Sequence, residues 1–144
     1  MIAVDTNILV HAHRAEAPDH RAALQRLTEL ATGAAAWAIP GSCLVEFLRV
    51  ITHPRVLRRP HTLEEAQAAV RALLASPTLH VLWPTGDYLE VLLSTVADGR
   101  ATGNLVYDAQ VVALCRAHGV RVILSEDRDM RRFSSIRSET LAAR

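Results

Sequence analysis

The chain opens with Ile2-Ala3-Val4-Asp5-Thr6-Asn7, and this stretch predicts the fold class. A short apolar run without polar interruption is typical of a strand buried on both faces of a parallel sheet. The run stops at Asp5, and Asp, Thr and Asn are residue types that commonly begin a helix. The N-terminus therefore predicts a buried strand that leads directly into a helix.

Short apolar runs and helical patterns alternate along the rest of the chain. We expect strands at residues 2–4, 35–39, 79–82 and 120–124, with a weak fifth near residues 135–136. Helices are expected from near residue 7 and over about residues 19–30, 42–53, 62–76, 87–97 and 105–118. Thr62 and Glu65 have the spacing of a capping box, and Gly119 is placed as a helix C-cap. This alternation predicts right-handed crossovers and one α/β domain, residues 1–144, around a mostly parallel sheet.

Length and composition are those of one globular domain. The chain has 144 residues, of which 50% are hydrophobic, enough for a single core. No apolar stretch approaches the roughly 20 residues that span a bilayer, and no basic segment precedes the first apolar run. Cys43 and Cys115 lie in apolar helical patterns, as reduced core cysteines do. We therefore expect a cytoplasmic protein without membrane association, secretory signal, disulfide or zinc site.

Four acidic residues stand in four short motifs, and they carry the functional prediction. The motifs are Ala3-Val4-Asp5-Thr6-Asn7, Val45-Glu46-Phe47-Leu48, Val106-Tyr107-Asp108-Ala109 and Leu124-Ser125-Glu126-Asp127. Asp5 follows the first strand and Asp127 follows the fourth, so both face one crevice if these strands are neighbours. Carboxylates in one crevice repel each other unless a cation lies between them, and hard divalent cations prefer oxygen ligands. The leading prediction is a metal-dependent hydrolase.

Three of the four acids also have a structural explanation. Asp5 is equally well explained as the N-cap of the helix that follows it. Asp108 shares a helix face with apolar residues three, four and seven positions later, where an unpaired carboxylate needs a cation, an arginine or a raised pKa. An ion pair with arginine is thus the alternative to a metal ligand at Asp108. Glu46 lies opposite the apolar face of its helix and looks like an ordinary solvated position.

Taken in order, these motifs resemble the PIN-domain family, particularly the VapC-type toxins of bacterial toxin–antitoxin pairs. The resemblance covers essentially the whole chain. It rests on residues 4–9, residues 40–50, the stretch Gly103-Asn104-Leu105-Val106-Tyr107-Asp108-Ala109 and the stretch Leu124-Ser125-Glu126-Asp127-Arg128-Asp129. It implies a three-layer α/β/α sandwich around a mostly parallel sheet of four to five strands. Met130 is a departure, since many relatives have phenylalanine there, and it affects packing beside the site.

The resemblance also implies a function. It implies a Mg²⁺- or Mn²⁺-dependent endoribonuclease that acts as the toxin of a type II toxin–antitoxin pair, and a homodimer that binds a small antitoxin protein. The catalytic and metal-binding residues carried over from the family are Asp5, Glu46, Asp108 and Asp127. Asn7 and Ser125 match supporting hydrogen-bonding positions, and Asp129 matches a reserve acid. Mg²⁺ keeps several waters, so we expect Asp5 and Asp108 as direct ligands, with Glu46 and Asp127 completing the ring or positioning water.

The RNA substrate needs positive charge beside the acidic crevice. The formal net charge is only +1, and every basic residue is arginine, for which a coding bias is the simpler explanation. The candidate phosphate contacts are Arg128, Arg131, Arg132, Arg55, Arg58 and Arg59. A solvated charged loop explains these arginines equally well.

Two rival functions follow from the same residues. The first is a non-catalytic PIN-like interaction module, in which the acids serve an ion-stabilised scaffold or partner docking. The second is phosphoryl transfer with Asp5 as nucleophile. That chemistry usually has a second Asp two residues on and a dedicated lysine, whereas this chain has Asn7 and no lysine.

Overall fold

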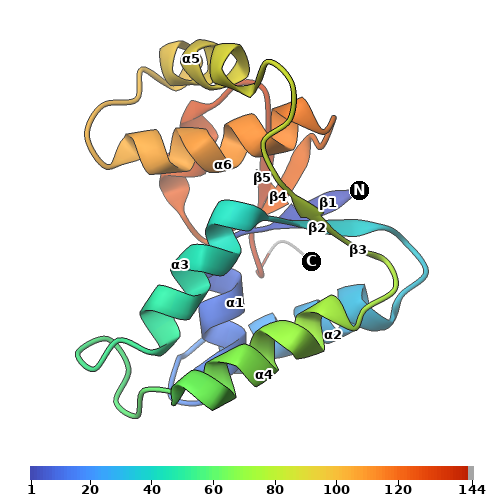
Figure 1. Ribbon diagram of the computed structural model, residues 1–144, viewed down its shortest axis with the longest axis vertical. Coiled ribbons are helices and arrows are strands. Elements are labelled where there is room, and N and C mark those ends of the chain that lie inside the picture. Colours follow the sequence, from blue (N-terminus) through green and yellow to red (C-terminus); the bar gives the residue numbers. More distant parts are fainter. Residues whose placement is uncertain (143–144) are drawn as a thin grey trace.

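Five short strands form one sheet in the computed structural model, which describes residues 1–142 (Figure 1). The strands are β1 (Ile2–Val4), β2 (Trp37–Pro40), β3 (Leu79–Leu82), β4 (Val122–Leu124) and β5 (Arg137–Glu139). Their order across the sheet is β3-β2-β1-β4-β5, and every neighbouring pair is parallel. The predicted parallel sheet is confirmed, with its weak fifth strand present at one edge.

Within the described residues, six α-helices and one 3₁₀ helix surround the sheet. They are α1 (Thr6–His13), α2 (His20–Thr32), α3 (Gly41–Ile51), α4 (Leu63–Leu74), α5 (Tyr88–Gly99), α6 (Leu105–Ala117) and the 3₁₀ helix η1 (Arg128–Arg132). Figure 1 shows α5 and α6 together on one side of the sheet, and α1, α2 and α4 on the other. The predicted three-layer α/β/α sandwich is therefore confirmed.

Some element boundaries differ from the prediction. Val120 and Arg121 do not belong to β4, because Val120 N donates to Cys115 O at 2.8 Å and Gly119 N to Arg116 O at 3.1 Å. With Gly119 at φ 70°, this pair of bonds is a Schellman motif that ends α6. The fifth strand starts after the predicted residues 135–136, because Ile136 N bonds to Phe133 O in a turn.

The start of α4 agrees with the prediction. Thr62 Oγ1 accepts from Glu65 N and Glu65 Oε2 accepts from Thr62 N, which is the predicted capping box. Cys43 and Cys115 are buried and free. Within residues 1–142, no helix combines the length and apolar character that crossing a bilayer needs.

Gly41 and Gly99 each allow an aromatic ring to pack close against the backbone of a helix. A Cβ on Gly41 would lie 2.3 Å from the Trp83 ring, so α3 begins against that indole only because residue 41 has no side chain. A Cβ on Gly99 would lie 2.2 Å from the Phe133 ring. Phe133 follows η1 directly and is buried, so its contact with α5 holds the segment that carries the fourth acidic motif.

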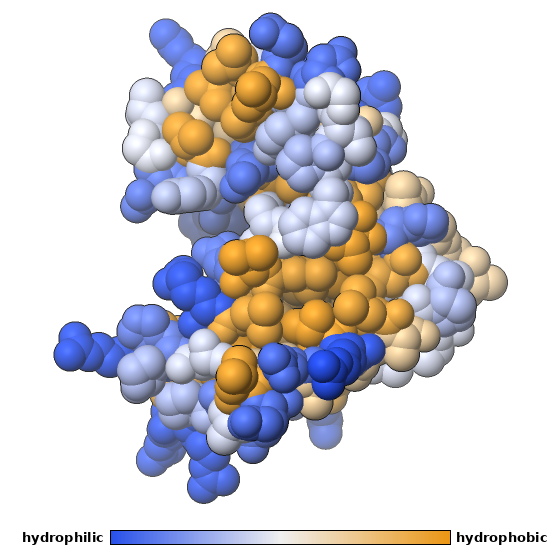
Figure 2. All heavy atoms as spheres, viewed as in Figure 1, coloured by the Kyte–Doolittle hydropathy of each residue, from blue (hydrophilic) through white to orange (hydrophobic). Residues whose placement is uncertain are grey.

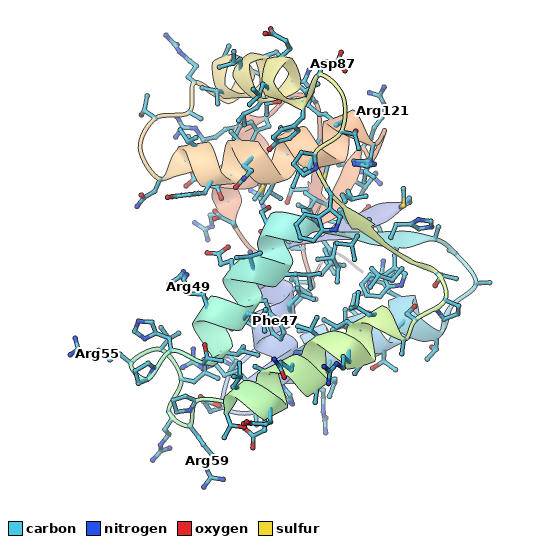
Figure 3. The ribbon with its side chains drawn as sticks, in the orientation of Figure 1. Phe47, Arg49, Arg55, Arg59, Asp87 and Arg121 are labelled. Carbon is cyan, nitrogen blue, oxygen red and sulfur yellow. The ribbon has the colours of Figure 1, made fainter. Side chains whose placement is uncertain are left out.

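Helix α3 has one buried face and one exposed face. Phe47 is fully buried, and the His13 ring contacts it edge-on with centroids 4.9 Å apart. Arg49 points away from the body of the molecule (Figure 3). The face opposite Phe47 also carries Glu46, as the apolar periodicity predicts.

Candidate active site

The carboxyl ends of β1 and β4 lie side by side. Their register pairs Val4 with Leu124, and Asp5 N donates to Leu124 O at 3.1 Å. The residues that follow the two strands, Asp5 and Ser125, therefore meet at one edge of the sheet. The prediction that Asp5 and Asp127 face one crevice required β1 and β4 to be neighbours, and the structure confirms that they are.

Asp5 is almost fully buried, at 5% exposure, and its carboxylate accepts four contacts. Oδ1 accepts from Thr6 N at 2.7 Å and lies 3.7 Å from the Cys43 thiol. Oδ2 accepts from Ser125 Oγ at 2.6 Å and from Asn7 Nδ2 at 2.8 Å. Burial raises the pKa of Asp5, hydrogen bonds from Ser125 and Thr6 lower it, and the charges of nearby acids raise it again. Asp5 thus caps α1 and also belongs to a charged cluster, so its two interpretations are compatible.

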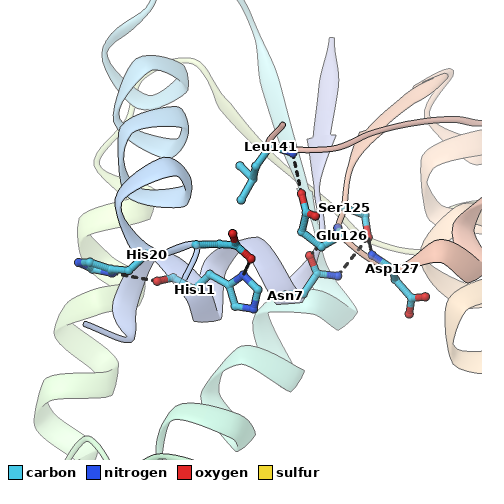
Figure 4. Close-up of polar contacts among 8 residues, drawn as sticks. Asn7, His11, His20, Ser125, Glu126, Asp127 and Leu141 are labelled. Carbon is cyan, nitrogen blue, oxygen red and sulfur yellow. Dashed lines mark hydrogen bonds and ion pairs between the residues drawn. The ribbon is translucent and has the colours of Figure 1, made fainter. Parts of the chain in front are cut away.

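Asn7 and Ser125 form a hydrogen-bonded frame around Asp5. Figure 4 shows the bonds that join these two residues to each other and to the backbone of Glu126 and Asp127. Asn7 Nδ2 donates to Ser125 Oγ at 3.0 Å, and Asn7 Oδ1 accepts from Glu126 N at 3.1 Å. Ser125 Oγ also accepts from Asp127 N at 3.0 Å. The two residues expected to support the site by hydrogen bonding therefore link Asp5 to the backbone that carries Asp127.

Asp108, Asp127 and Asp129 form the tightest acidic group. One carboxylate oxygen from each lies within 4.8 Å of the other two. Burial, followed by the charges of Asp127, Asp5, Asp129 and Glu46, raises the pKa of Asp108 to about 6. None of the arginines in residues 1–142 lies within ion-pair distance of Asp108, so the alternative of a structural ion pair is not realised there.

Glu46 lies at the rim of the cluster. Its side chain is 51% exposed, and Arg49 Nη2 lies 3.5 Å from Oε1. Thr6 Oγ1 donates to Glu46 Oε2 at 2.9 Å, which connects Glu46 to the residue next to Asp5. The charge of Glu46 acts on both Asp5 and Asp108. Glu46 is thus solvated, as its periodicity indicates, and also part of the acidic constellation.

The structure adds detail that sequence reasoning did not contain. Asp129, named only as a reserve acid, lies in the tight group, whereas Asp5 lies outside it, is buried, and raises the pKa of Asp108 through its charge. Thr6 was not singled out, although its position beside Asp5 in the first turn of α1 was a signal. Its partner Glu46 is 40 positions away, so only the packing of α1 against α3 reveals the bond.

Comparison with known proteins identifies the family. The family model of the PIN domain matches residues 2–136. The chain belongs to the PIN-domain family. Its sequence is 35% identical over 137 residues to ribonuclease VapC43 of Mycobacterium tuberculosis, covering 95% of this chain and 92% of that protein. It is 32% identical over 137 residues to ribonuclease VapC31 of the same organism, covering 95% and 96%. The resemblance seen in the motifs is confirmed.

Solved structures share the PIN fold. VapBC2 of Rickettsia felis, solved on a DNA fragment from its promoter, matches with a TM-score of 0.71 at 16% identity, covering 97% of this chain and 98% of that one. The sarcin–ricin loop cleaving toxin VapC20 of Mycobacterium tuberculosis matches with a TM-score of 0.68 at 24% identity, covering 95% and 99%. At these identities the likeness supports the fold.

The acids of this PIN domain fit a hard divalent cation. Three carboxylate oxygens converge within 4.8 Å, and Asp108 carries a raised pKa, as expected for acids packed together without a counter-charge. The two recorded arginine contacts, Arg49 at 3.5 Å from Glu46 and Arg132 at 3.9 Å from Asp129, involve exposed side chains at the edges. Oxygen-only ligands favour Mg²⁺ or Mn²⁺ over softer metals.

Proposed function

We propose that this protein is a metal-dependent endoribonuclease that acts as the toxin of a type II toxin–antitoxin pair. The observation that carries the proposal is the convergence of Asp108, Asp127 and Asp129, with one carboxylate oxygen from each within 4.8 Å of the others. Packing like charges together is costly without a counter-charge, but it creates affinity for a cation. Kinship to ribonucleases named VapC, at 31–35% identity over most of the chain, supports the same activity.

The proposed catalytic and metal-binding residues are Asp5, Glu46, Asp108 and Asp127, with Asp129 added as a fifth acid. A bound Mg²⁺ or Mn²⁺ ion would lower the pKa of water and neutralise charge that develops on the RNA phosphate. Ser125 and Asn7 fix the orientation of the Asp5 carboxylate through bonds of 2.6 and 2.8 Å. Thr6 holds Glu46 Oε2, which leaves Oε1 directed to the exposed rim, where Glu46 can orient water and substrate.

RNA would approach across positively charged surfaces. Arg55 and Arg59 project into solvent from the loop between α3 and α4, on the side toward which Arg49 also points (Figure 3). Arg131 and Arg132, which are exposed, lie on η1 directly after Asp127. Both groups suit contacts to a phosphate backbone, because guanidinium groups offer planar donor pairs.

A protein antitoxin is the proposed partner. Figure 2 shows apolar side chains gathered across the middle of one face of the molecule, where α3 and α4 lie in Figure 1. Helix α4 exposes Leu63 and Leu74, and Trp83 follows β3 with 52% exposure. An apolar segment of a partner would cover such a face, and an arginine from it would be a suitable counter-charge for the acidic crevice.

We also propose a homodimer. Leu89 and Leu93, four residues apart on α5, are 70% and 62% exposed, and Tyr107 on α6 is 71% exposed. Large apolar side chains exposed on two packed helices are typical of a self-association surface. The cytoplasmic location expected from the sequence is part of the same proposal.

The rival function is a non-catalytic PIN-like module. The two functions differ in turnover, so the test is incubation of structured RNA with the purified protein and Mn²⁺ or Mg²⁺. We expect cleavage products that disappear with EDTA and with Asp108→Asn. Binding of RNA without cleavage, under conditions in which the cation is bound, would favour the module.

A further inference from the structure

The end of the described chain is bonded to the loop that follows β4. Glu139 O accepts from Ser125 N at 2.9 Å, and Leu141 N donates to Glu126 Oε1 at 2.6 Å (Figure 4). Glu126 lies between Ser125 and Asp127 but was not among the predicted site residues. Its carboxylate faces the C-terminal segment rather than the acidic cluster.

The backbone of Glu126 determines the orientation of the Asn7 amide. Glu126 N donates to Asn7 Oδ1 at 3.1 Å, so the oxygen end of this amide is occupied by a donor. The opposite end, Nδ2, must then face Asp5 Oδ2, at 2.8 Å, and Ser125 Oγ, at 3.0 Å. An amide has one donor end and one acceptor end, so losing the Glu126 N–H would remove the constraint that turns the donor end toward Asp5.

The C-terminal segment, residues 139–141, is held by the bonds from Ser125 N to Glu139 O and from Leu141 N to Glu126 Oε1. A cavity of about 280 Å³ lies beside it, lined on one side by Thr140 and Leu141 and on the other by Ala22 and Gln25 of α2. Side chains that border a cavity have fewer packing contacts to hold them. The short bond from Leu141 to Glu126 is therefore an important restraint on both partners.

We propose that Glu126 is a positioning residue. Its carboxylate binds the Leu141 N–H, which keeps its backbone N–H directed at Asn7 and thereby orients the Asn7 amide and the Asp5 carboxylate for cation binding. The C-terminal segment is on this account a structural support of the acidic site. This inference rests on the proposed metal-dependent function.

Four variants distinguish loss of the hydrogen bond between Leu141 N and Glu126 Oε1 from other effects of substitution. Glu126→Ala removes the acceptor, whereas Glu126→Gln removes the charge and keeps an oxygen that accepts from Leu141 N. Leu141→Pro removes the N–H donor. Ala142→Pro is the matched control, since it places the same ring one residue later, where no bond from the N–H is recorded within residues 1–142.

The first measurement is the affinity of the 144-residue protein for Mn²⁺ alone, by titration calorimetry. We expect Glu126→Ala and Leu141→Pro each to weaken it about tenfold, the lower end of what the loss of a residue supporting metal ligands costs. Glu126→Gln and Ala142→Pro should stay within about twofold of the wild type. The double variant Glu126→Ala/Leu141→Pro should be no weaker than either single variant, because both remove one bond. Additive losses, or a Gln variant as weak as the Ala variant, would overturn the proposal.

The second measurement needs no metal. The side-chain amide resonances of Asn7 in the metal-free protein should shift in Glu126→Ala and Leu141→Pro and stay in place in the other two variants. Unchanged Asn7 resonances in all four would refute the positioning role. If the wild type binds no Mn²⁺ but the Asn7 shifts follow this pattern, the proposed function fails while the connection from Leu141 to Asn7 stands.

Discussion

Ser125 Oγ donates to Asp5 Oδ2 at 2.6 Å, across 120 positions of sequence. The bond forms because β1 and β4 are parallel neighbours in register, so the residues that follow Val4 and Leu124 meet at one edge of the sheet. It lowers the pKa of a carboxyl that burial raises. The strand order therefore buries Asp5 and also supplies a hydrogen bond that offsets part of the cost of burying its charge. A substitution at Asp5 tests the proposed activity.

Asp5→Asn should abolish RNA cleavage, with a loss on the order of 1,000-fold, equivalent to about 4 kcal/mol of activation free energy. The amide retains one acceptor but cannot supply a second anionic oxygen to a cation. The free energy of unfolding should fall by about 1 kcal/mol, because the new NH₂ faces the donors of Asn7. Asp19→Asn, at an exposed acid before α2, is the control. Cleavage assays and circular dichroism check this, and equal cleavage by Asp5→Asn and wild type would refute the assignment.

Asp108 predicts a pH dependence of stability in the metal-free protein. Its pKa is about 6 in the folded state, against 3.8 for an ordinary aspartate, so the folded protein holds this proton more tightly. The stability that protonation gives is present below about pH 4 and is lost as the pH rises through about 6. Asp108→Asn should therefore be more stable than the wild type at pH 7, with a difference that shrinks toward pH 4. Urea unfolding in EDTA measures it; a difference independent of pH would contradict the burial of this charge.

Thr6→Val should lower cleavage about tenfold while hardly changing the melting temperature. The substitution removes the hydroxyl that holds Glu46 Oε2 at 2.9 Å and keeps the shape of the side chain. Thr6→Ser retains the hydroxyl and should retain activity. Comparable kinetics for the Val and Ser variants would show that Glu46 needs no such restraint.

Charge reversal at Arg131 and Arg132 should weaken RNA binding and flatten its salt dependence. Each lost contact to a single-stranded phosphate lowers the log–log slope by about 0.7, so about 1.4 for the pair. Fluorescence anisotropy in the Asp5→Asn background, where RNA stays intact, gives the slope. Arg21→Glu, at an exposed arginine of α2, is the matched control. An unchanged slope would leave these arginines as a solvated surface.

Replacing Leu89 and Leu93 with Glu should convert the proposed dimer to a monomer. Two charges on the exposed face of α5 cannot be buried in a self-association interface without a large desolvation cost. Sedimentation velocity distinguishes the two species, and Leu74→Glu on α4 is the control. A wild type that is monomeric at micromolar concentration would rule out this part of the proposal.

Local patterns in the sequence were sufficient for much of the architecture. The apolar run that ends at Asp5, the capping box at Thr62 and the C-cap at Gly119 each depend on residues within a few positions of one another. Helix and strand periodicity therefore predicted the α/β class, the parallel sheet and the exposed face on which Glu46 lies. The errors lie at element ends, where hydrogen bonds such as that from Val120 to Cys115 compete with the strand, and at η1, which was not predicted.

The sequence by itself determined which acids are available and that two of them follow buried strands. Only the tertiary structure decided that β1 lies beside β4, that Asp129 joins Asp108 and Asp127, that Thr6 holds Glu46, and that Leu141 binds Glu126. The physical reason is the distance along the sequence over which each signal acts. Periodicity and capping report a few neighbouring residues, whereas these contacts depend on the strand order and helix packing that bring distant segments together.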